Sequence, residues 1–158
     1  MPSRLIFAVC VVGTIFFYKQ YKNRPKVSSI VFTQLKPNTA ATTDALADCK
    51  KSQYCLVTYV APWCPACHAY LSESRSHVES ALEMKKYKSV IIVGADETQN
   101  VNQLVEQIGV TAYGDVGDQF LKVNKIDFFP THIVLQNGQM KYYGQKSYDW
   151  INSDLLKP

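Results

Sequence analysis

The sequence of 158 residues has few of the residue types that define fibrous, low-complexity or disulfide-scaffold proteins. It contains 7 Gly, 7 Pro and 5 Cys. That is too little glycine and proline for a collagen-like or low-complexity chain, and too few cysteines for a miniprotein held together by dense disulfides. Charged residues make up only 19% and apolar residues 47%, which excludes a disordered polymer. The length suits one domain with a modest appendage.

The main part of the chain also lacks an excess of basic residues. Residues 1–26 hold five basic side chains and no acidic one: Arg4, Lys19, Lys22, Arg24 and Lys26. The remaining residues hold 12 basic and 13 acidic side chains, so the formal net charge of +4 belongs to the N-terminus. A nucleic-acid-binding domain needs a basic stripe on its folded surface. The composition predicts none.

No apolar run reaches the roughly 20 residues that usually span a bilayer. The longest begins at Leu5 and ends at Tyr18, fourteen residues without a charge. Arg4 and Lys19 could extend toward the headgroups, which favours an uncleaved membrane anchor over residues 1–22, followed by a polar linker at 23–27. The alternatives are a cleaved signal peptide, which lacks an A-x-A-like site nearby, and a core helix, which an apolar run on every face disfavours.

Residues 28–158 alternate between strand and helix patterns and predict an α/β domain. Cys55–Val60 and Val90–Val93 are compact apolar runs typical of buried strands, and Asn137-Gly138 is a type I′ turn signal. We therefore expect a mixed sheet, parallel at first and antiparallel at the hairpin, covered by helices on both faces. The other expected strands are Ile30–Leu35, Thr131–Leu135 and Gln139–Tyr143; the expected helices are Thr43–Lys51, Cys64–Lys86, Val101–Ile108, Gln119–Val123 and, capped by Ser147, Tyr148–Leu156; Thr111–Asp118 is expected to be a loop.

The junction between the first strong strand and its helix carries two cysteines three residues apart, Cys64 and Cys67. A thiolate at a helix N-terminus is stabilised by unpaired amides and the helix dipole, and the thiolate is the attacking species in disulfide exchange. Cys64 is expected to be the exposed nucleophile. Cys67, one turn further along, is expected to resolve the mixed disulfide.

At this point the chain resembles the thioredoxin superfamily over roughly residues 28–157. The likeness rests on Trp63-Cys64-x-x-Cys67 after a strand, on Phe129-Pro130-Thr131 before another, and on the hairpin that follows. The resemblance implies a three-layer α/β/α sandwich. It also implies a cis Pro130 whose loop faces the cysteines and leaves the backbone of Phe129 free to pair with a bound peptide. Trp63, Phe129, Pro130 and Thr131 would bind substrate, with Phe128 nearby.

The motif departs from thioredoxin itself in ways that leave the redox potential open. Pro65-Ala66 separates the cysteines in place of Gly-Pro, and His68 follows them. Pro65, Ala66 and His68 are therefore candidates for tuning the thiolate. Thr58 stands where the family often buries a carboxylate, so proton transfer at Cys67 needs water or another group.

Two other classes compete for the same residues. Cys64-x-x-Cys67-His68 also fits c-type haem attachment, with Met84 or Met140 as a distal ligand. Cys49, Cys55, Cys64 and Cys67 could hold structural zinc, although their spacing is not that of a typical knuckle. His77 and His132 lack a partner pattern and are predicted to be surface residues.

Cys49 and Cys55 are either a second disulfide or two buried thiols. A disulfide would close a short loop and imply an oxidising compartment. The distribution of charge favours the opposite orientation. More cations follow the apolar run than precede it, and by the positive-inside rule this places the domain in the cytoplasm. We favour the extracytoplasmic side of the inner membrane, facing the periplasm.

The sequence therefore predicts a membrane-tethered thiol–disulfide oxidoreductase that acts on protein substrates with a redox partner protein. It needs no organic cofactor or metal. The alternative is a binding or assembly module that keeps the fold and turns over nothing. The direction of electron flow, the client and the oligomeric state are left open.

Overall fold

A computed structural model describes residues 30–41, 44–84 and 87–145 of the chain. The predicted anchor at 1–22, the linker at 23–27 and the predicted helix Tyr148–Leu156 with its cap Ser147 lie outside these ranges. Within them, no helix is both long enough and apolar enough to cross a bilayer.

A single mixed sheet of six strands forms the middle of the domain, in the order β1-β4-β3-β2-β5-β6. β2, β3 and β4 run parallel, while β1, β5 and β6 are antiparallel to their neighbours. This confirms the predicted mixed sheet. The strands are β1 (Lys36–Pro37), β2 (Tyr54–Val60), β3 (Lys88–Val93), β4 (Ala112–Gly114), β5 (Thr131–Gln136) and β6 (Gln139–Gly144).

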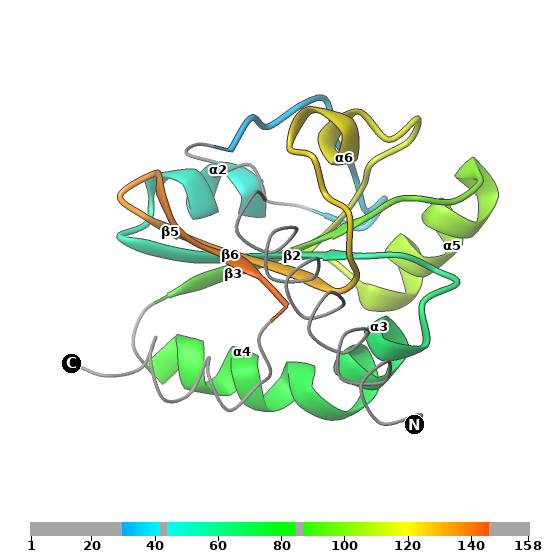
Figure 1. Ribbon diagram of the computed structural model, residues 1–158. Coiled ribbons are helices and arrows are strands. Elements are labelled where there is room, and N and C mark those ends of the chain that lie inside the picture. Colours follow the sequence, from blue (N-terminus) through cyan, green and yellow to red (C-terminus); the bar gives the residue numbers. More distant parts are fainter. Residues whose placement is uncertain (1–29, 42–43, 85–86, 146–158) are drawn as a thin grey trace, which may run out of the picture.

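Helices cover both faces of the sheet, as Figure 1 shows. α2 (Ala45–Lys51) and α6 (Gln119–Val123) pack on one face. The other face carries α3 (Pro65–Ala69), the π-helical turn η1 (Tyr70–Ser74), α4 (Arg75–Met84) and α5 (Thr98–Ile108). α3, η1 and α4 follow one another without a break, so a helix with one π-turn inside it forms over 65–84 of the range expected from Cys64 to about Lys86, and residues 85–86 are not described. The result is the predicted three-layer α/β/α arrangement.

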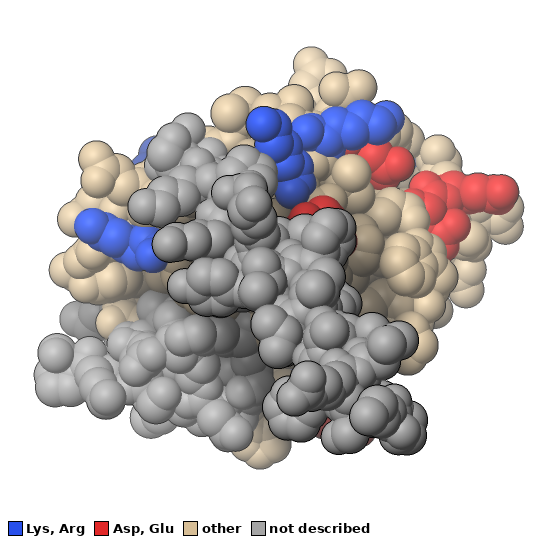
Figure 2. Space-filling model, in the orientation of Figure 1, with Lys and Arg blue, Asp and Glu red and all other residues tan. Residues whose placement is uncertain are grey.

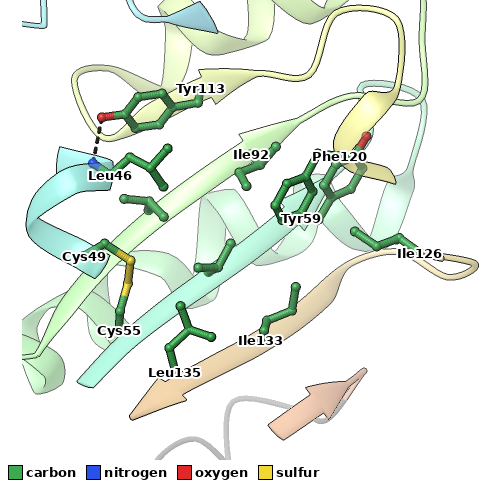
Figure 3. Close-up of a cluster of buried hydrophobic side chains, with 12 residues drawn as sticks. Leu46, Cys49, Cys55, Tyr59, Ile92, Tyr113, Phe120, Ile126, Ile133 and Leu135 are labelled. Atoms are coloured by element: carbon green, nitrogen blue, oxygen red, sulfur yellow. Dashed lines mark hydrogen bonds between the residues drawn. A yellow bond between two sulfur atoms is a disulfide. The ribbon is translucent and has the colours of Figure 1, made fainter. Parts of the chain in front are cut away.

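The central strand β2 is buried on both sides, which explains its uninterrupted apolar run. Cys55, Val57 and Tyr59 face α2 and α6, where the Tyr59 ring stacks on Phe120 with centroids 5.9 Å apart (Figure 3). Leu56, Thr58 and Val60 face the opposite layer, under the helix that follows the cysteine motif. Successive residues of β2 therefore contact the two helix layers in turn.

The predicted strand Ile30–Leu35 does not form, and only Lys36–Pro37 pairs with β4. Ile30, Phe32 and Leu35 pack against the core, whereas Val31 is exposed. Its backbone bonds to a side chain instead of a strand: the Val31 N–H donates to Asn124 Oδ1 at 2.8 Å, and Asn124 Nδ2 donates to the Val31 carbonyl at 2.9 Å. The apolar residues suggested a strand, but the partner of the Val31 backbone is a side chain 93 residues away.

The predicted loop Thr111–Asp118 is also partly wrong, because Ala112–Gly114 forms β4 beside β3. Three residues are too few to show a strand periodicity, and Gly114 argues against a strand. A Cβ at Gly114 would stand 3.2 Å from Val101 Cγ1, so the absence of a side chain lets α5 approach the sheet closely. The hairpin prediction is confirmed, with positive φ at both Asn137 (52°) and Gly138 (76°) between β5 and β6.

Candidate active site

Cys64 lies at the N-cap position of α3, and Pro65 takes the first helical position, where its missing N–H costs nothing. The Cys67 N–H donates to Cys64 Sγ at 3.1 Å. Cys64 and Cys67 are joined in a disulfide with their Cα atoms 5.2 Å apart. When this bond is reduced, the same amide is placed to stabilise a thiolate on Cys64, because an N–H donor favours the charged form.

The expectation that Cys64 is exposed is wrong in this disulfide form. Cys64 is 4% exposed and Cys67 is 0% exposed, and both belong to the apolar cluster between α3, α5 and the sheet. Cys64 is nevertheless the more exposed of the two cysteines, as expected. Of the pair, Cys64 alone keeps contact with solvent.

The proline loop meets the cysteines across this cluster. The Phe129–Pro130 peptide bond is cis, and Phe129 packs against the cluster that contains both cysteines. The Phe129 ring also makes an edge contact with Trp63, with centroids 5.3 Å apart. Trp63 is 58% exposed. Three of the residues singled out by the sequence therefore lie together, namely Trp63, Cys64 and Phe129, and Pro130 follows Phe129 in the chain.

The backbone of Phe129 is not free, contrary to expectation. Its carbonyl accepts a hydrogen bond from Gln145 Nε2 at 2.6 Å. Thr131, fully buried, donates its hydroxyl to the Phe128 carbonyl and so shapes the loop from below. A peptide that pairs with the Phe129 carbonyl has to displace the exposed Gln145 amide.

Hydrogen bonds that run from the surface to a buried carboxylate hold the loop that carries Trp63. The Trp63 indole N–H donates to the Ala95 carbonyl at 2.6 Å, and the Ala95 N–H donates to Asp118 Oδ1 at 2.8 Å. Beneath it the carboxylate of Asp115, 0% exposed, accepts the Tyr59 hydroxyl at 3.0 Å and two backbone N–H groups of α6. The pKa of Tyr59 is raised far above its usual range, mainly by burial and then by the neighbouring charge of Asp115. Tyr59 therefore stays protonated and acts as a donor.

His68 points to solvent, as predicted for its side chain. Its Nε2 lies 2.6 Å from the Pro62 carbonyl. Pro65 and Ala66 are exposed as well. Beside them is a hollow of about 350 Å³, lined by Pro62, Trp63, His68 and residues of α5. On the face shown in Figure 2, described basic side chains near the top of the view lie beside acidic ones, and another basic side chain lies apart at the left.

The structure joins Cys49 and Cys55 in a second disulfide, which ties the end of α2 to the start of β2 (Figure 3). Both cysteines are 1% exposed and belong to the cluster beneath α2 and α6. The Cys64–Cys67 pair lies in the cluster on the other face of the sheet. The zinc hypothesis needed all four sulfurs in one place, and the sheet separates them.

The two thiols on which the haem hypothesis rests are not free in this structure. Covalent haem attachment uses both thiols of the motif, and here the two sulfurs are bonded to each other inside an apolar cluster. Among the described residues there is no group of three or more His, Cys, Asp or Glu side chains placed to hold a metal ion.

The prediction that His132 is a surface residue is wrong, whereas His77 is exposed as expected. His132 is 4% exposed, and its Nδ1 lies 3.1 Å from Thr58 Oγ1. The ring of Tyr70 meets the imidazole edge-on with centroids 5.0 Å apart. Burial lowers the pKa of His132 to about 4 and raises that of Tyr70. Sequence reasoning missed Tyr70 and Asp115, because neither belongs to a recognisable motif. The position of Tyr70 one helical turn after Cys67 was the one feature that could have identified it.

The sequence matches no protein-family model and no curated protein. Its structure resembles several solved ones at low identity. The thioredoxin domain of a thiol–disulfide oxidoreductase from Bacteroides vulgatus superposes with a TM-score of 0.60 at 15% identity, covering 80% of this chain and 93% of that one. An exposed lipoprotein thioredoxin of Streptococcus pneumoniae gives 0.58 at 18% identity, covering 78% and 96%. A secreted Mycobacterium tuberculosis disulfide oxidoreductase gives 0.54 at 14% identity, covering 74% and 89%. The chain therefore has a thioredoxin-like fold.

Proposed function

We propose that the protein is a thiol–disulfide oxidoreductase that exchanges disulfides with protein substrates through Cys64 and Cys67. The observation that carries the proposal is the position of Cys64. Its sulfur caps a helix, accepts the Cys67 N–H, is bonded to Cys67 and shares a cluster with the cis-proline loop. The structural neighbours named as oxidoreductases support it.

In the reducing direction the Cys64 thiolate attacks one sulfur of a substrate disulfide, and the other substrate sulfur leaves as a thiolate. The Cys67 thiolate then attacks Cys64 Sγ, which forms the Cys64–Cys67 disulfide and releases the second substrate thiolate. Two electrons pass from the protein to the substrate, and the released thiolates take up protons. The oxidising direction is the same sequence reversed.

Trp63, Phe129 and Pro130 form the substrate-binding surface in this proposal, while Thr131, which was expected to bind substrate as well, is fully buried and shapes the loop beneath them. The exposed Trp63 ring offers an apolar contact beside the reactive sulfur, and the Phe129 carbonyl offers a hydrogen-bond acceptor once Gln145 moves away. Pro65, Ala66 and His68 border the motif on its solvent side and would tune the thiolate. Neither step requires a metal or an organic cofactor.

We further propose that residues 1–22 anchor the domain at 28–158 to the membrane, with the domain on the periplasmic side. The Cys49–Cys55 disulfide supports this side, because such bonds persist in oxidising compartments. The secreted and exposed neighbours also support it. A C-terminal alkaline phosphatase fusion should be active, since that enzyme folds only outside the cytoplasm, and an inactive fusion would contradict the placement.

Trapping of the mixed disulfide tests the activity directly. Cys67→Ser should accumulate a covalent complex with an unfolded, disulfide-containing protein such as scrambled ribonuclease, whereas Cys64→Ser should accumulate none. The matched control is Cys49→Ala with Cys55→Ala, which leaves the motif intact and should keep the exchange activity. If no complex is trapped and the wild type does not reduce insulin, the proposed activity is wrong. The alternative, a binding module without turnover, would then stand.

The reduction potential of the Cys64–Cys67 pair against glutathione would settle the direction of exchange. A reduction potential of about −270 mV is typical of a reductant, and a potential of about −120 mV is typical of an oxidant.

A further inference from the structure

The hollow of about 350 Å³ beside the cysteine motif has a single carboxylate in its wall. Pro62, Trp63 and His68 line one side of it, and Asp96 lines the other together with side chains of α5. Asp96 is the only carboxylate among the described residues that line the hollow, and no lysine or arginine is among them. A hollow of this composition attracts a cation, because no basic side chain in its wall neutralises the carboxylate.

The carboxylate of Asp96 is held in place through one of its two oxygens. Its Oδ1 accepts the Glu97 N–H at 2.7 Å and a hydrogen bond from Asn100 Nδ2 at 3.1 Å. No described residue hydrogen-bonds to Oδ2, and the side chain is half-buried. The carboxylate is therefore oriented before a ligand binds and keeps one oxygen for that ligand. Such preorganisation reduces the entropy that binding costs.

Direct hydrogen bonds link the exposed Trp63 ring to the segment that carries Asp96. The indole N–H donates to the carbonyl of Ala95, the residue before Asp96, at 2.6 Å. Ala95 has a φ of 60°, which is uncommon for a residue other than glycine, and its N–H donates to Asp118 Oδ1 at 2.8 Å. The aromatic ring and the carboxylate are therefore held on opposite sides of one hollow, directly after Trp63 in the chain comes Cys64, and both walls are fixed by observed contacts.

An arginine side chain matches the groups in this wall. Its guanidinium can donate to Asp96 Oδ2 and to the amide oxygens of Gln103 and Gln107, which α5 contributes to the hollow. Its planar surface can pack against the Trp63 ring. Leu104, also in the wall, offers an apolar contact for the methylene stem. A lysine would keep the charge but lose the fork of donors.

We propose that this hollow binds an arginine side chain of the substrate polypeptide, close in sequence to the cysteine that Cys64 attacks, an inference that rests on the function proposed above. Trp63 connects the two sites, because it lines the hollow, precedes Cys64 and contacts Phe129 of the proline loop. A bound chain runs from the proline loop past Cys64 to the hollow. The preferred substrates are polypeptides with an arginine a few residues from a disulfide-bonded cysteine.

Short peptides that carry one cysteine as a mixed disulfide with thionitrobenzoate test this preference. The Cys64 thiolate of the reduced full-length protein attacks the peptide sulfur, and the thionitrobenzoate that leaves is followed by absorbance in a stopped-flow instrument. Matched peptides carry arginine or citrulline, its uncharged isostere, two residues before the cysteine or two residues after it. At one of these positions the arginine peptide should react about fivefold faster than the citrulline peptide, as an exposed ion pair with a cation–π contact allows.

Two variants separate the proposed site from a general attraction of cationic peptides. Asp96→Asn keeps the Oδ1 acceptor for Glu97 and Asn100 and removes the charge, and it should reduce the arginine preference to less than about twofold. The matched control is Glu97→Gln, which removes an exposed carboxylate from the next position without changing the lining of the hollow. It should keep the preference, whereas a general attraction would fall equally in both variants.

The outcomes distinguish this inference from the proposed function. If the wild type reacts with no peptide faster than Cys64→Ser does, the proposed function is wrong and the arginine site falls with it. If the wild type reacts with every peptide but shows no preference for arginine, or shows the same preference in Asp96→Asn, the arginine site alone is wrong. Should Asp96→Asn fail to fold, Gln103→Lys decides, because it places a cation in the hollow: an unchanged preference in that variant contradicts the site.

Discussion

The hydroxyl of Tyr59 offers a sharp test of the buried framework behind the active-site loop. It donates to Asp115, a carboxylate with 0% exposure whose other donors are the backbone N–H groups of Phe120 and Leu121 at 2.9 and 3.0 Å. Tyr59→Phe removes that donor and leaves little space. A hydrogen bond to a charged group contributes about 1.5–3 kcal/mol, so we expect the variant to lose about 2 kcal/mol of unfolding free energy.

Gly94→Ala should disturb the same Tyr59 hydroxyl by a steric clash. A Cβ at Gly94 would stand 2.0 Å from the Tyr59 hydroxyl oxygen, so the tyrosine must move and give up its bond to Asp115. Overpacking costs about 1–3 kcal/mol, and with the lost hydrogen bond the total is about 4 kcal/mol. In the double variant the hydroxyl is already absent, so the two losses should fall short of additivity by about 2 kcal/mol.

Urea unfolding of the four oxidised proteins, followed by circular dichroism, measures this coupling. Leu104→Val, on a different face of the sheet, serves as a control whose loss should add to that of Tyr59→Phe. If the losses from Tyr59→Phe and Gly94→Ala simply add, the hydroxyl is not the shared element and the reasoning about Asp115 is wrong.

Three further results are expected. Cys49→Ala with Cys55→Ala should cost about 2 kcal/mol in urea unfolding, since the bond closes a loop of only six residues' separation, and a loss near zero would contradict that account. The pKa of His132 is about 4 in the folded disulfide form and about 6.5 when unfolded, so its contribution is full above about pH 6.5 and declines toward pH 4. Urea unfolding at pH 7 and at 4.5 should show the wild type losing about 2 kcal/mol more than His132→Gln, and equal losses would refute the burial argument. Gln145→Ala should lower the KM for a peptide disulfide by freeing the Phe129 carbonyl, and steady-state kinetics that show an unchanged KM would mean that substrate does not bond there.

Sequence reasoning found the fold because the elements that define it carry strong local signals. The apolar run of β2, the Asn137-Gly138 turn and the proline after Cys64 each prescribe a conformation by themselves. It failed where a partner far along the chain decides. Val31 meets the side chain of Asn124, and the three residues of β4 form a strand only because β3 lies beside them.

The same division holds at the candidate site. Cys64 and Cys67 stood out by their spacing after a strand, and the cis bond before Pro130 was expected from the resemblance to the thioredoxin superfamily. The burial of His132 was not, because a histidine in a strand shows its environment only when both faces of that strand are known to be covered. The expectation of a free Phe129 backbone failed for a similar reason, since Gln145 reaches it from 16 residues away.

The two disulfides lie on opposite sides of one continuous sheet. For a sulfur of one pair to reach the other, the strands between them would have to separate. Scrambled isomers, such as a Cys55–Cys64 bond, should therefore be absent from intact molecules and accumulate only as the chain denatures. Peptide mapping of such isomers would serve as a chemical clock for whole-domain opening during storage or stress.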